Sequence, residues 1–314
     1  MMIAVHSRVL GPAVGGVRLR RYAGWRDGLE DALRLAEAMT YKCAAAGLSF
    51  GGGKTVIALD EDVPLTPTLR QAALEDLGEF IESFGGSYLA GPDVGTGPAD
   101  MVVLRRKTAH AFCVPEEHGG TGSSSIPTAA GVLAALRAGV RHVFGADSVD
   151  GLTVVVSGMG SVGSLVAAGL PGARIIVSDV DETKRDDRFE WVGPGEALRT
   201  PADIFVPAAV GGVLGPDTAG EVEARLVVGP ANNQLTTDSV ADLLAAKGIT
   251  WIPDFVASAG GVIYTLCREI EKLSHDEAMT RVETIGATVD TILTANTTPL
   301  AAAMDLATAR LKTT

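Results

Sequence analysis

The feature that most constrains the fold of this chain is a glycine fingerprint between an apolar strand and a helix. The apolar run Val154–Val156 leads into GMGSVG at 158–163, and helical spacing follows through Leu165–Leu170. In a GxGxxG motif the first glycine permits a tight turn, the second lets a pyrophosphate approach the backbone, and the third lets helix and strand pack closely. The helix N-terminus adds free N–H groups and the positive end of its dipole. The pattern predicts a dinucleotide-binding unit whose cofactor contacts are Gly158, Gly160, Ser161, Val162 and Gly163.

A carboxylate stands at the position where such a unit selects its cofactor. The strand-like run RIIVSD places Asp179 sixteen residues after Gly163. A carboxylate there accepts hydrogen bonds from ribose hydroxyls and repels a 2′-phosphate, so the sequence predicts NAD rather than NADP. Lys184 and Arg185 follow closely and weaken that exclusion. The alternative interpretation is a glycine-rich turn followed by an exposed aspartate at a strand end.

Further short apolar runs, each predicted to be a strand, follow the fingerprint toward the C-terminus. From Asp150 onward the runs LTVVVSG, RIIVSD, DIFVPA, RLVVGP and TWIPD alternate with helical or loop segments. Continuous apolar runs of this length are typical of parallel strands that are buried on both faces. We therefore expect an α/β protein with a doubly wound Rossmann sheet in residues 123–298, and terminal helices over 275–290 and 298–311.

The first 122 residues have a different texture and are predicted to form a second α/β domain, with a cleft between the two. The glycine- and serine-rich loop at 116–125 is the expected crossing between the domains. The predicted elements are a strand at 2–9, a turn at 11–16, a helix at 25–46, a glycine-rich lead at 51–54 into a strand at 55–59, and a helix at about 66–84.

Composition excludes several classes of function. Hydrophobic residues make up 46% of the 314 positions, which is enough for two buried cores. The 38 acidic against 26 basic residues give a net charge of −12, which argues against binding to nucleic acid or to anionic membranes. No apolar run approaches the roughly 20 residues that span a bilayer, and the first residues lack the apolar centre of a signal peptide. The three scattered cysteines predict reduced thiols, no metal site and a cytoplasmic location.

Three polar residues in the first domain are candidates for chemistry. Lys42 ends an apolar-faced helix, Lys54 follows three glycines, and Asp93 lies in a turn between Pro92 and further glycines. A desolvated lysine has a lowered pKa and can act as a base, while a lysine that stays ionised can bind a carboxylate. Each residue also has a structural alternative, because lysines at helix ends complement the dipole and aspartates in turns cap their own backbone.

Seven motifs, in order along the chain, resemble one enzyme family. They are GPAVGGVRLRRY, LEDALRLAEAMTYKCAAAG, GGGKTVI, GPDVGT, GMGSVG, GPANNQL and PDFVASAGGVI. Together they are similar to the glutamate/leucine/phenylalanine/valine dehydrogenase family, in particular its branched-chain and aromatic amino-acid branch, over nearly the whole chain. The resemblance implies an NAD-dependent oxidoreductase that reversibly deaminates an apolar L-amino acid to a 2-oxo acid and ammonium. It also implies a homo-oligomer, a dimer or larger, in which the helix at about 299–314 returns to the N-terminal substrate domain.

The resemblance further implies roles for individual residues. Lys54 is expected to be the general base that activates water, Asp93 to relay protons to and from the amine, and Lys42 to bind the substrate carboxylate. The small Gly91 is expected to leave room for a larger substrate side chain. The other expected contacts are Gly15, Gly16, Asn232 and Asn233 with the substrate, Val14, Gly91, Val262 and Thr265 as the side-chain pocket, and Thr128 with the nicotinamide.

Departures from the family pattern leave alternatives open. The chain begins at the strand IAVHSRVLGP, where the family normally has a further helix and strand, and is interpreted as an N-terminally short member. Only 24 residues separate Asp179 from the strand at Asp203, where the family has a longer helix–strand unit, and Ser258 and Ala208 stand where Asn and Cys are usual. The alternatives are a pathway-specific relative that acts on an unusual amino or oxo acid, and a non-catalytic cofactor-binding scaffold. The presence of both candidate lysines and the candidate aspartate argues against the scaffold.

Overall fold

The computed structural model describes residues 1–60 and 62–312, and the chain divides into two compact units. The first contains Met1–Ser124, Thr265–His275 and the chain from Ala307 onward, and the second contains Ser125–Tyr264 and Asp276–Leu306. The last two residues of the helix expected over 299–314 lie outside the described residues.

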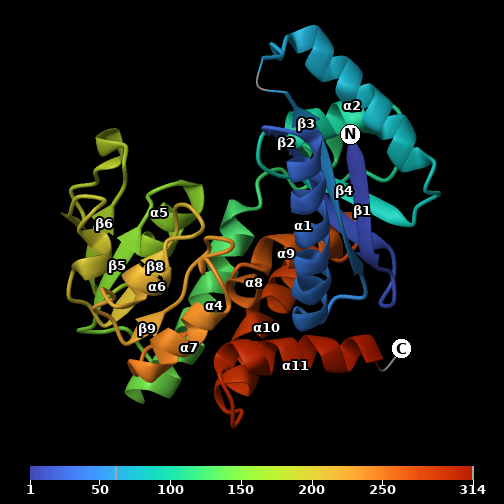
Figure 1. The fold of residues 1–314 in the computed structure, drawn as a ribbon. Coiled ribbons are helices and arrows are strands. Elements are labelled where there is room, and N and C mark those ends of the chain that lie inside the picture. Colours follow the sequence, from blue (N-terminus) through green and yellow to red (C-terminus); the bar gives the residue numbers. More distant parts are fainter. Residues whose placement is uncertain (61, 313–314) are drawn as a thin grey trace. The chain divides into compact units, whose positions relative to one another are not determined.

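The first unit is built on a four-stranded sheet (Figure 1). Across the sheet the strands are β1 (Met2–Ser7), β3 (Gly51–Leu59), β2 (Ala13–Arg21) and β4 (Tyr88–Pro92). Strand β1 runs antiparallel to β3, whereas β2 is parallel to both β3 and β4. The helices of this unit are α1 (Trp25–Ala45), α2 (Pro67–Glu82) and α3 (Pro98–Arg105), with a 3-10 turn η1 (Glu116–His118).

Alternation along β3 directs its side chains into two separate cores. Val56 packs with alanines of α1, and the next residue, Ile57, packs with leucines of α2. Successive residues of a strand point to opposite faces. Lys54 therefore shares the α1 face with Val56, while Thr55 faces the other core, where its hydroxyl lies 2.8 Å from the hydroxyl of Tyr88.

The glycine-rich segment expected as a turn at 11–16 is largely a strand, and the glycine-rich lead expected at 51–54 is already part of the strand that follows it. Strand β2 includes Gly15 and Gly16, and β3 begins at Gly51. A Cβ on Gly15 would lie 2.1 Å from the carbonyl oxygen of Gly53, and one on Gly52 would lie 2.1 Å from the backbone nitrogen of Thr40 in α1. These glycines are required because β2, β3 and α1 approach more closely than any side chain permits.

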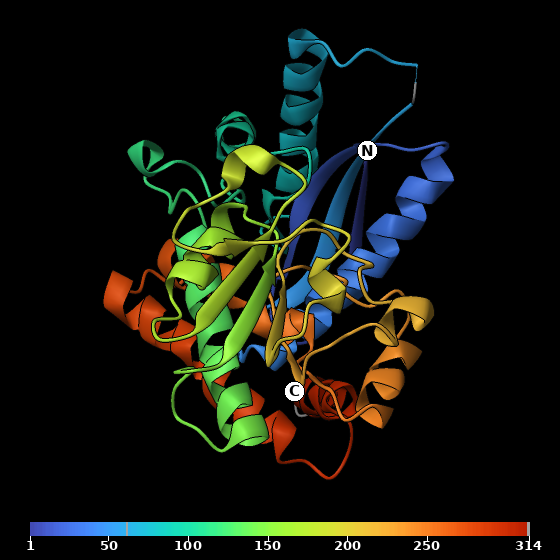
Figure 2. The ribbon, with the colours of Figure 1, turned by 90° about the vertical axis from the view of Figure 1, so that its left-hand side faces the viewer.

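The second unit confirms the expected Rossmann architecture (Figure 2). Its six strands are all parallel and lie in the order β10-β9-β8-β5-β6-β7. This is the doubly wound order, with the direction of winding reversing between β5 and β8. The strands are β5 (Thr153–Ser157), β6 (Arg174–Ser178), β7 (Glu190–Trp191), β8 (Ile204–Pro207), β9 (Leu226–Val227) and β10 (Thr250–Trp251).

Eight α-helices follow Ser124 in the described part of the chain. They are α4 (Ser125–Phe144), α5 (Ser161–Ala168), α6 (Pro216–Ala219), α7 (Ser239–Ala246), α8 (Asp254–Ala257), α9 (Gly260–Glu269), α10 (His275–Leu293) and α11 (Pro299–Lys312), with 3-10 turns η2 (Glu182–Lys184) and η3 (Ala197–Arg199). The division between the two units falls within α9 and again within α11. Within the first unit, the end of α11 contacts α1, where Arg310 donates a hydrogen bond to the carbonyl oxygen of Ala44 at 2.8 Å.

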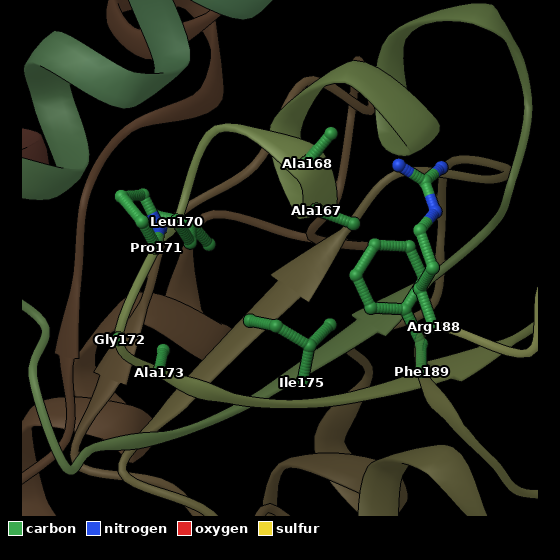
Figure 3. A pocket seen from close by; sticks show the side chains of 9 residues that line it. All are labelled: Ala167, Ala168, Leu170, Pro171, Gly172, Ala173, Ile175, Arg188 and Phe189. Atoms are coloured by element: carbon green, nitrogen blue, oxygen red, sulfur yellow. The ribbon is translucent and has the colours of Figure 1, made fainter.

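The connection from β6 to β7 is unusually short. In this described segment the chain returns through η2 without forming an α-helix, and β7 has only two residues. A hollow of about 240 Å³ lies at the amino end of β6, where Phe189, Ile175 and Ala167 face one another (Figure 3). The hollow is on the opposite end of the strand from Asp179, which follows its carboxyl end.

Candidate active site

A largely buried network of charges joins β2, β3, helix α1 and the turn that follows β4. The Nζ of Lys54 lies 2.8 Å from the Oδ2 of Asp93, and the Nε of Arg18 donates to the same oxygen at 2.8 Å. Arg18 also donates through Nη1 to the Oδ2 of Asp31 at 2.8 Å, and the Tyr22 hydroxyl donates to that oxygen at 2.7 Å. The structure thus brings the two expected catalytic residues, Lys54 and Asp93, into contact, and it adds an arginine that sequence reasoning had not singled out.

Burial and charge pull the proton of Lys54 in opposite directions. Lys54 is 5% exposed, and burial lowers its pKa below the ordinary value, with the Asp93 carboxylate offsetting only part of that effect. Burial also opposes ionisation of Asp93, but the cations of Lys54 and Arg18 outweigh it and lower the pKa of Asp93. Because an arginine stays protonated, Asp93 keeps a cationic partner when Lys54 loses its proton. The site therefore places an amine with a lowered pKa beside a carboxylate that stays ionised when the amine is neutral.

The turn that presents Asp93 is held tightly against β2. The Thr96 hydroxyl donates to the carbonyl oxygen of Val17 at 2.7 Å and accepts from the Asp93 N–H at 3.0 Å. Gly95 has a φ of 83°, and a Cβ there would lie 1.9 Å from the carbonyl oxygen of Leu19. The turn needs glycine at this position for both reasons, and its hydrogen bonds fix the carboxylate that Lys54 contacts.

Of the two glycines expected to admit a substrate, only Gly16 borders the charged pair. A Cβ on Gly16 would lie 2.7 Å from the Cβ of Asp93 and 3.1 Å from the Nζ of Lys54. A side chain would therefore displace the lysine and the aspartate. Gly15 instead faces the backbone of β3, so strand packing accounts for it.

Lys42 is half-buried in the last turn of α1. Two residues earlier, the backbone of Thr40 packs directly against Gly52 of β3. Gly52 and Lys54 are on the same face of β3, because they are two residues apart in a strand. The end of α1 that contains Lys42 is therefore held against the part of β3 that contains Lys54.

The space expected beside Gly91 is occupied. A Cβ on Gly91 would lie 2.7 Å from two ring atoms of Phe112, which is 6% exposed. Phe112 is placed there because residues 110–112 run beside β4: the Ala90 N–H donates to the carbonyl oxygen of His110, and the Phe112 N–H donates to that of Ala90, both at 2.9 Å. The expectation of extra room at Gly91 was wrong, since the sequence did not show that an aromatic ring fills it. Of the other expected pocket residues, Val14 and Thr265 are buried and Val262 is half-buried.

In the second unit, the three glycines of the fingerprint have the three geometries that the motif requires. Gly158 has a φ of 115°, which allows the tight turn. A Cβ on Gly163 would lie 1.9 Å from the carbonyl oxygen of Gly158, so helix α5 packs directly on the strand end. A Cβ on Gly160 would meet no heavy atom within 4 Å, so its backbone is open to approach. Ser161 and Val162 begin α5 at this open end, and this arrangement fits a pyrophosphate.

Asp179 lies beside this loop and is 9% exposed. Its Oδ2 accepts from the Met159 N–H at 2.7 Å, its Oδ1 accepts from the Asp181 N–H at 2.9 Å, and the ammonium of Lys184 lies 3.1 Å from Oδ2. Burial opposes ionisation of Asp179, but these backbone donors and Lys184 outweigh it and lower its pKa. The carboxylate is therefore ionised and rigidly placed, and Lys184 partly neutralises it.

The remaining expected contacts are in loops of the second unit. Asn232 and Asn233 are exposed, and Asn233 has a φ of 53°. The buried amide of Gln234 supports them by donating to the carbonyl oxygens of Gly229 and Ala231 at 2.9 and 3.0 Å. The Ser258 hydroxyl donates to the Oδ1 of Asn232 at 3.3 Å. Thr128 is half-buried in the first turn of α4.

Residues 1–60 and 62–312 show neither a metal-binding cluster nor a membrane-spanning helix. These residues contain no group of three or more His, Cys, Asp or Glu side chains that could hold a metal ion. None of their helices combines the length and the apolar character that a bilayer crossing demands.

Comparison with known proteins identifies relatives along the whole chain. Residues 2–110 match the family model described as Glu/Leu/Phe/Val dehydrogenase, dimerisation domain, and residues 173–296 match that of Glutamate/Leucine/Phenylalanine/Valine dehydrogenase. The phenylalanine dehydrogenase of Lysinibacillus sphaericus is 42% identical over 274 residues, which cover 83% of this chain and 71% of that protein. The leucine dehydrogenase of Geobacillus stearothermophilus is 36% identical over 298 residues, covering 93% and 80%. The crystal structure of L-tryptophan dehydrogenase from Nostoc punctiforme superposes with a TM-score of 0.85 at 32% identity, covering 99% of this chain and 91% of that one.

Proposed function

Because this chain belongs to the glutamate/leucine/phenylalanine/valine dehydrogenase family, we propose that it oxidatively and reversibly deaminates an apolar L-amino acid with NAD, giving a 2-oxo acid and ammonium. The protein is an amino acid dehydrogenase, and enzymes of this family use a nicotinamide cofactor. The observation that supports the chemistry most directly is the buried contact of Lys54 with Asp93 at 2.8 Å. The choice of NAD and of an apolar substrate is part of the proposal.

In the proposed reaction, the residues of the first unit handle protons and orient the substrate. The bound nicotinamide supplies the acceptor for the hydride that leaves the substrate α-carbon. Lys54, whose pKa is lowered by burial, takes a proton from the water that attacks the resulting iminium carbon. Asp93 accepts a proton from the amino group and returns one as ammonium departs. Lys42 holds the substrate carboxylate as a point charge.

Lys54 suits the role of base better than an exposed lysine would. Its amine is buried, so the neutral form that accepts a proton is populated at a lower pH than in water. Arg18 keeps Asp93 ionised in the resting site even when Lys54 is neutral, so the carboxylate is available to accept a proton from the amine. The two groups thus divide the proton transfers between them.

The residues of the second unit fit a dinucleotide, and we assign NAD. The open backbone at Gly160 and the start of α5 would hold the pyrophosphate. The ionised Asp179 would accept hydrogen bonds from ribose hydroxyls and repel a 2′-phosphate. The Lys184 ammonium at 3.1 Å reduces that repulsion, so discrimination is expected to be moderate. The nicotinamide contact of Thr128 and the substrate contacts of Asn232 and Asn233 remain predictions.

The apolar substrate class rests on two observations. Relatives at 42%, 36% and 32% identity are named for phenylalanine, leucine and tryptophan. In the first unit, the expected pocket positions Val14 and Gly91 are apolar, and Phe112 adds an aromatic ring beside Gly91. We also propose a homo-oligomer, since residues 2–110 match the dimerisation domain of the family. A cytoplasmic location stays a prediction from the sequence.

A panel of L-amino acids, each assayed with NAD and with NADP, tests the proposal. The absorbance of the reduced nicotinamide is followed, and binding of each cofactor is measured separately. We expect turnover with apolar amino acids and faster turnover with NAD. Binding of NAD without turnover of any amino acid would favour a scaffold, and turnover restricted to charged amino acids would reject the substrate class.

A further inference from the structure

A second buried carboxylate in the first unit takes no part in the reaction proposed above. Glu269, the last residue of α9, is 5% exposed. Its Oε1 accepts from the N–H groups of Cys113 and Thr121 at 2.9 and 2.8 Å and from the Thr121 hydroxyl at 2.8 Å. Its Oε2 accepts from the Cys113 N–H at 3.0 Å and from the Nη2 of Arg105 at 3.3 Å. A buried charge with this many donors fixes the groups around it, because any displacement leaves the charge unpaired.

The group that Glu269 holds most directly has an unfavourable backbone conformation. Cys113 has a φ of 62°, in the left-handed region that residues with a side chain rarely adopt. Both carboxylate oxygens of Glu269 lie within hydrogen-bond distance of its N–H. Such a conformation persists only where the surroundings hold it. Glu269 stabilises this conformation of Cys113. Its hydrogen bonds to Thr121 also fix the other end of the loop at 113–121 to the same carboxylate.

Cys113 connects this clamp to two positions of the expected substrate pocket. The preceding residue, Phe112, places its ring against Gly91, two residues before Asp93. The Thr265 hydroxyl hydrogen-bonds to the sulfur of Cys113. Thr265 lies one helical turn before Glu269 on α9, so the clamp and the pocket residue share a face of that helix.

We propose that Glu269 is a positioning residue for the substrate pocket, which acts by holding Cys113 in the left-handed conformation that sets the places of Phe112 and Thr265. The inference rests on the proposed function, since it names what shapes the side-chain pocket of that reaction. Glu269 touches neither substrate nor cofactor in this account. Arg105 completes the arrangement, since its Nε donates to the carbonyl oxygen of Ala111 at 2.8 Å while its Nη2 faces Glu269.

Glycine at position 113 provides the decisive test, because glycine adopts a positive φ without a hold. Glu269→Ala, Cys113→Gly and the double variant are compared with the wild type. We expect Glu269→Ala to raise KM for the preferred amino acid by about tenfold or more, the size expected when charge-assisted hydrogen bonds are lost. The order of preference among apolar amino acids should also change, while NADH affinity is retained. Cys113→Gly should raise KM less than Glu269→Ala does, because glycine keeps the backbone conformation but lacks the sulfur that the Thr265 hydroxyl contacts. Removing Glu269 as well should raise KM little further, so the double variant should have a lower KM than Glu269→Ala.

A merely structural role for Glu269 predicts a different set of results. Glu269→Ala would then lower the melting temperature, but the folded variant would keep the wild-type KM and order of preference. That result, or a double variant no better than Glu269→Ala, would overturn the proposal. Glu271→Ala is the matched control, since it removes an exposed carboxylate two residues further along the chain.

The rate of the wild type is measured first, so that failure of the clamp and of the proposed function can be told apart. If the wild type oxidises no amino acid, the proposed function fails, and the clamp is judged by alkylation of Cys113 with iodoacetamide, followed by peptide mass analysis. Cys113 is 6% exposed, and its release in Glu269→Ala should speed its labelling relative to the fully buried Cys43. Equal labelling of Cys113 in both proteins would overturn the clamp.

Discussion

Replacing Lys54 with methionine is the substitution that bears most directly on the proposed chemistry. Methionine keeps an unbranched apolar stem of similar length but lacks the amine. A general base contributes typically about 10²- to 10⁴-fold in rate, which corresponds to about 3–5 kcal/mol of barrier. The cost to folding should be smaller than the about 3–5 kcal/mol that accompanies an uncompensated buried charge. Asp93 keeps a cationic partner in the variant, because the Nε of Arg18 remains 2.8 Å from its Oδ2.

Initial rates at saturating amino acid and NAD measure the effect on kcat, and quenching of protein fluorescence measures NADH affinity. We expect Lys54→Met to lose about two to four orders of magnitude in kcat, with NADH affinity unchanged. Lys107→Met is the matched control, since it removes an exposed ammonium that pairs with Glu79 at 2.7 Å. A Lys54→Met variant with the wild-type kcat would remove Lys54 from the mechanism.

Three further predictions follow from the charges of the two units. Arg18→Met should move the rising limb of the pH profile of kcat/KM to higher pH, because the cation of Arg18 helps to lower the pKa of Lys54; a limb that stays in place or moves to lower pH would contradict the assigned coupling. Burial opposes ionisation of Asp31, but hydrogen bonds from tyrosine and arginine side chains outweigh it and lower its pKa from 3.8 to about 2. Asp31→Asn should therefore lose about 2 kcal/mol of unfolding free energy in urea at neutral pH, and this gap should close as the pH falls through about 4 to about 2; a gap that does not depend on pH would refute the assigned cause. Asp179→Ala should weaken NAD about tenfold or more by removing a charged acceptor, and should weaken NADP less; equal losses for the two cofactors would rule out its role in selection.

Periodic segments could be predicted from the sequence, because their periods reflect burial directly. The helix expected at 25–46 is α1 (Trp25–Ala45), and the short apolar runs after Asp150 form the parallel sheet in doubly wound order. Glycine-rich segments were the main failure. In β2 and β3 the glycines allow neighbouring backbones to approach closely, and they do not form turns. A glycine-rich sequence is compatible with either role. Only the identity of the neighbouring strand decides between them.

The charged site shows the same limit. The resemblance to the family assigned Lys54 and Asp93 to one reaction, whereas nothing in the sequence analysis distinguished Arg18 from its neighbours Arg20 and Arg21. Alternation along β2 places Gly16, Arg18 and Arg20 on one face. The same alternation places Arg21 on the opposite face from Arg18. Arg21 accordingly takes no part in the charged site, and its Nη1 donates to the carbonyl oxygen of Asp60 at 2.7 Å. The signal was present, but it depends on knowing that residues 13–21 form a strand.

Two compensations in the first unit have no local signal at all. The ring of Phe112 fills the space that the absent side chain of Gly91 leaves. Glu269, 156 residues further along the chain, stabilises the unfavourable backbone conformation of Cys113. Each member of these pairs is unremarkable by itself: a glycine in a strand, a phenylalanine in a core, a cysteine, a glutamate at a helix end. Their effects are coupled, so substitutions at one member should be judged with the other. A change of pocket shape made at Gly91 alone would meet the phenylalanine ring, and a change at Glu269 would be transmitted through Cys113 to the same wall.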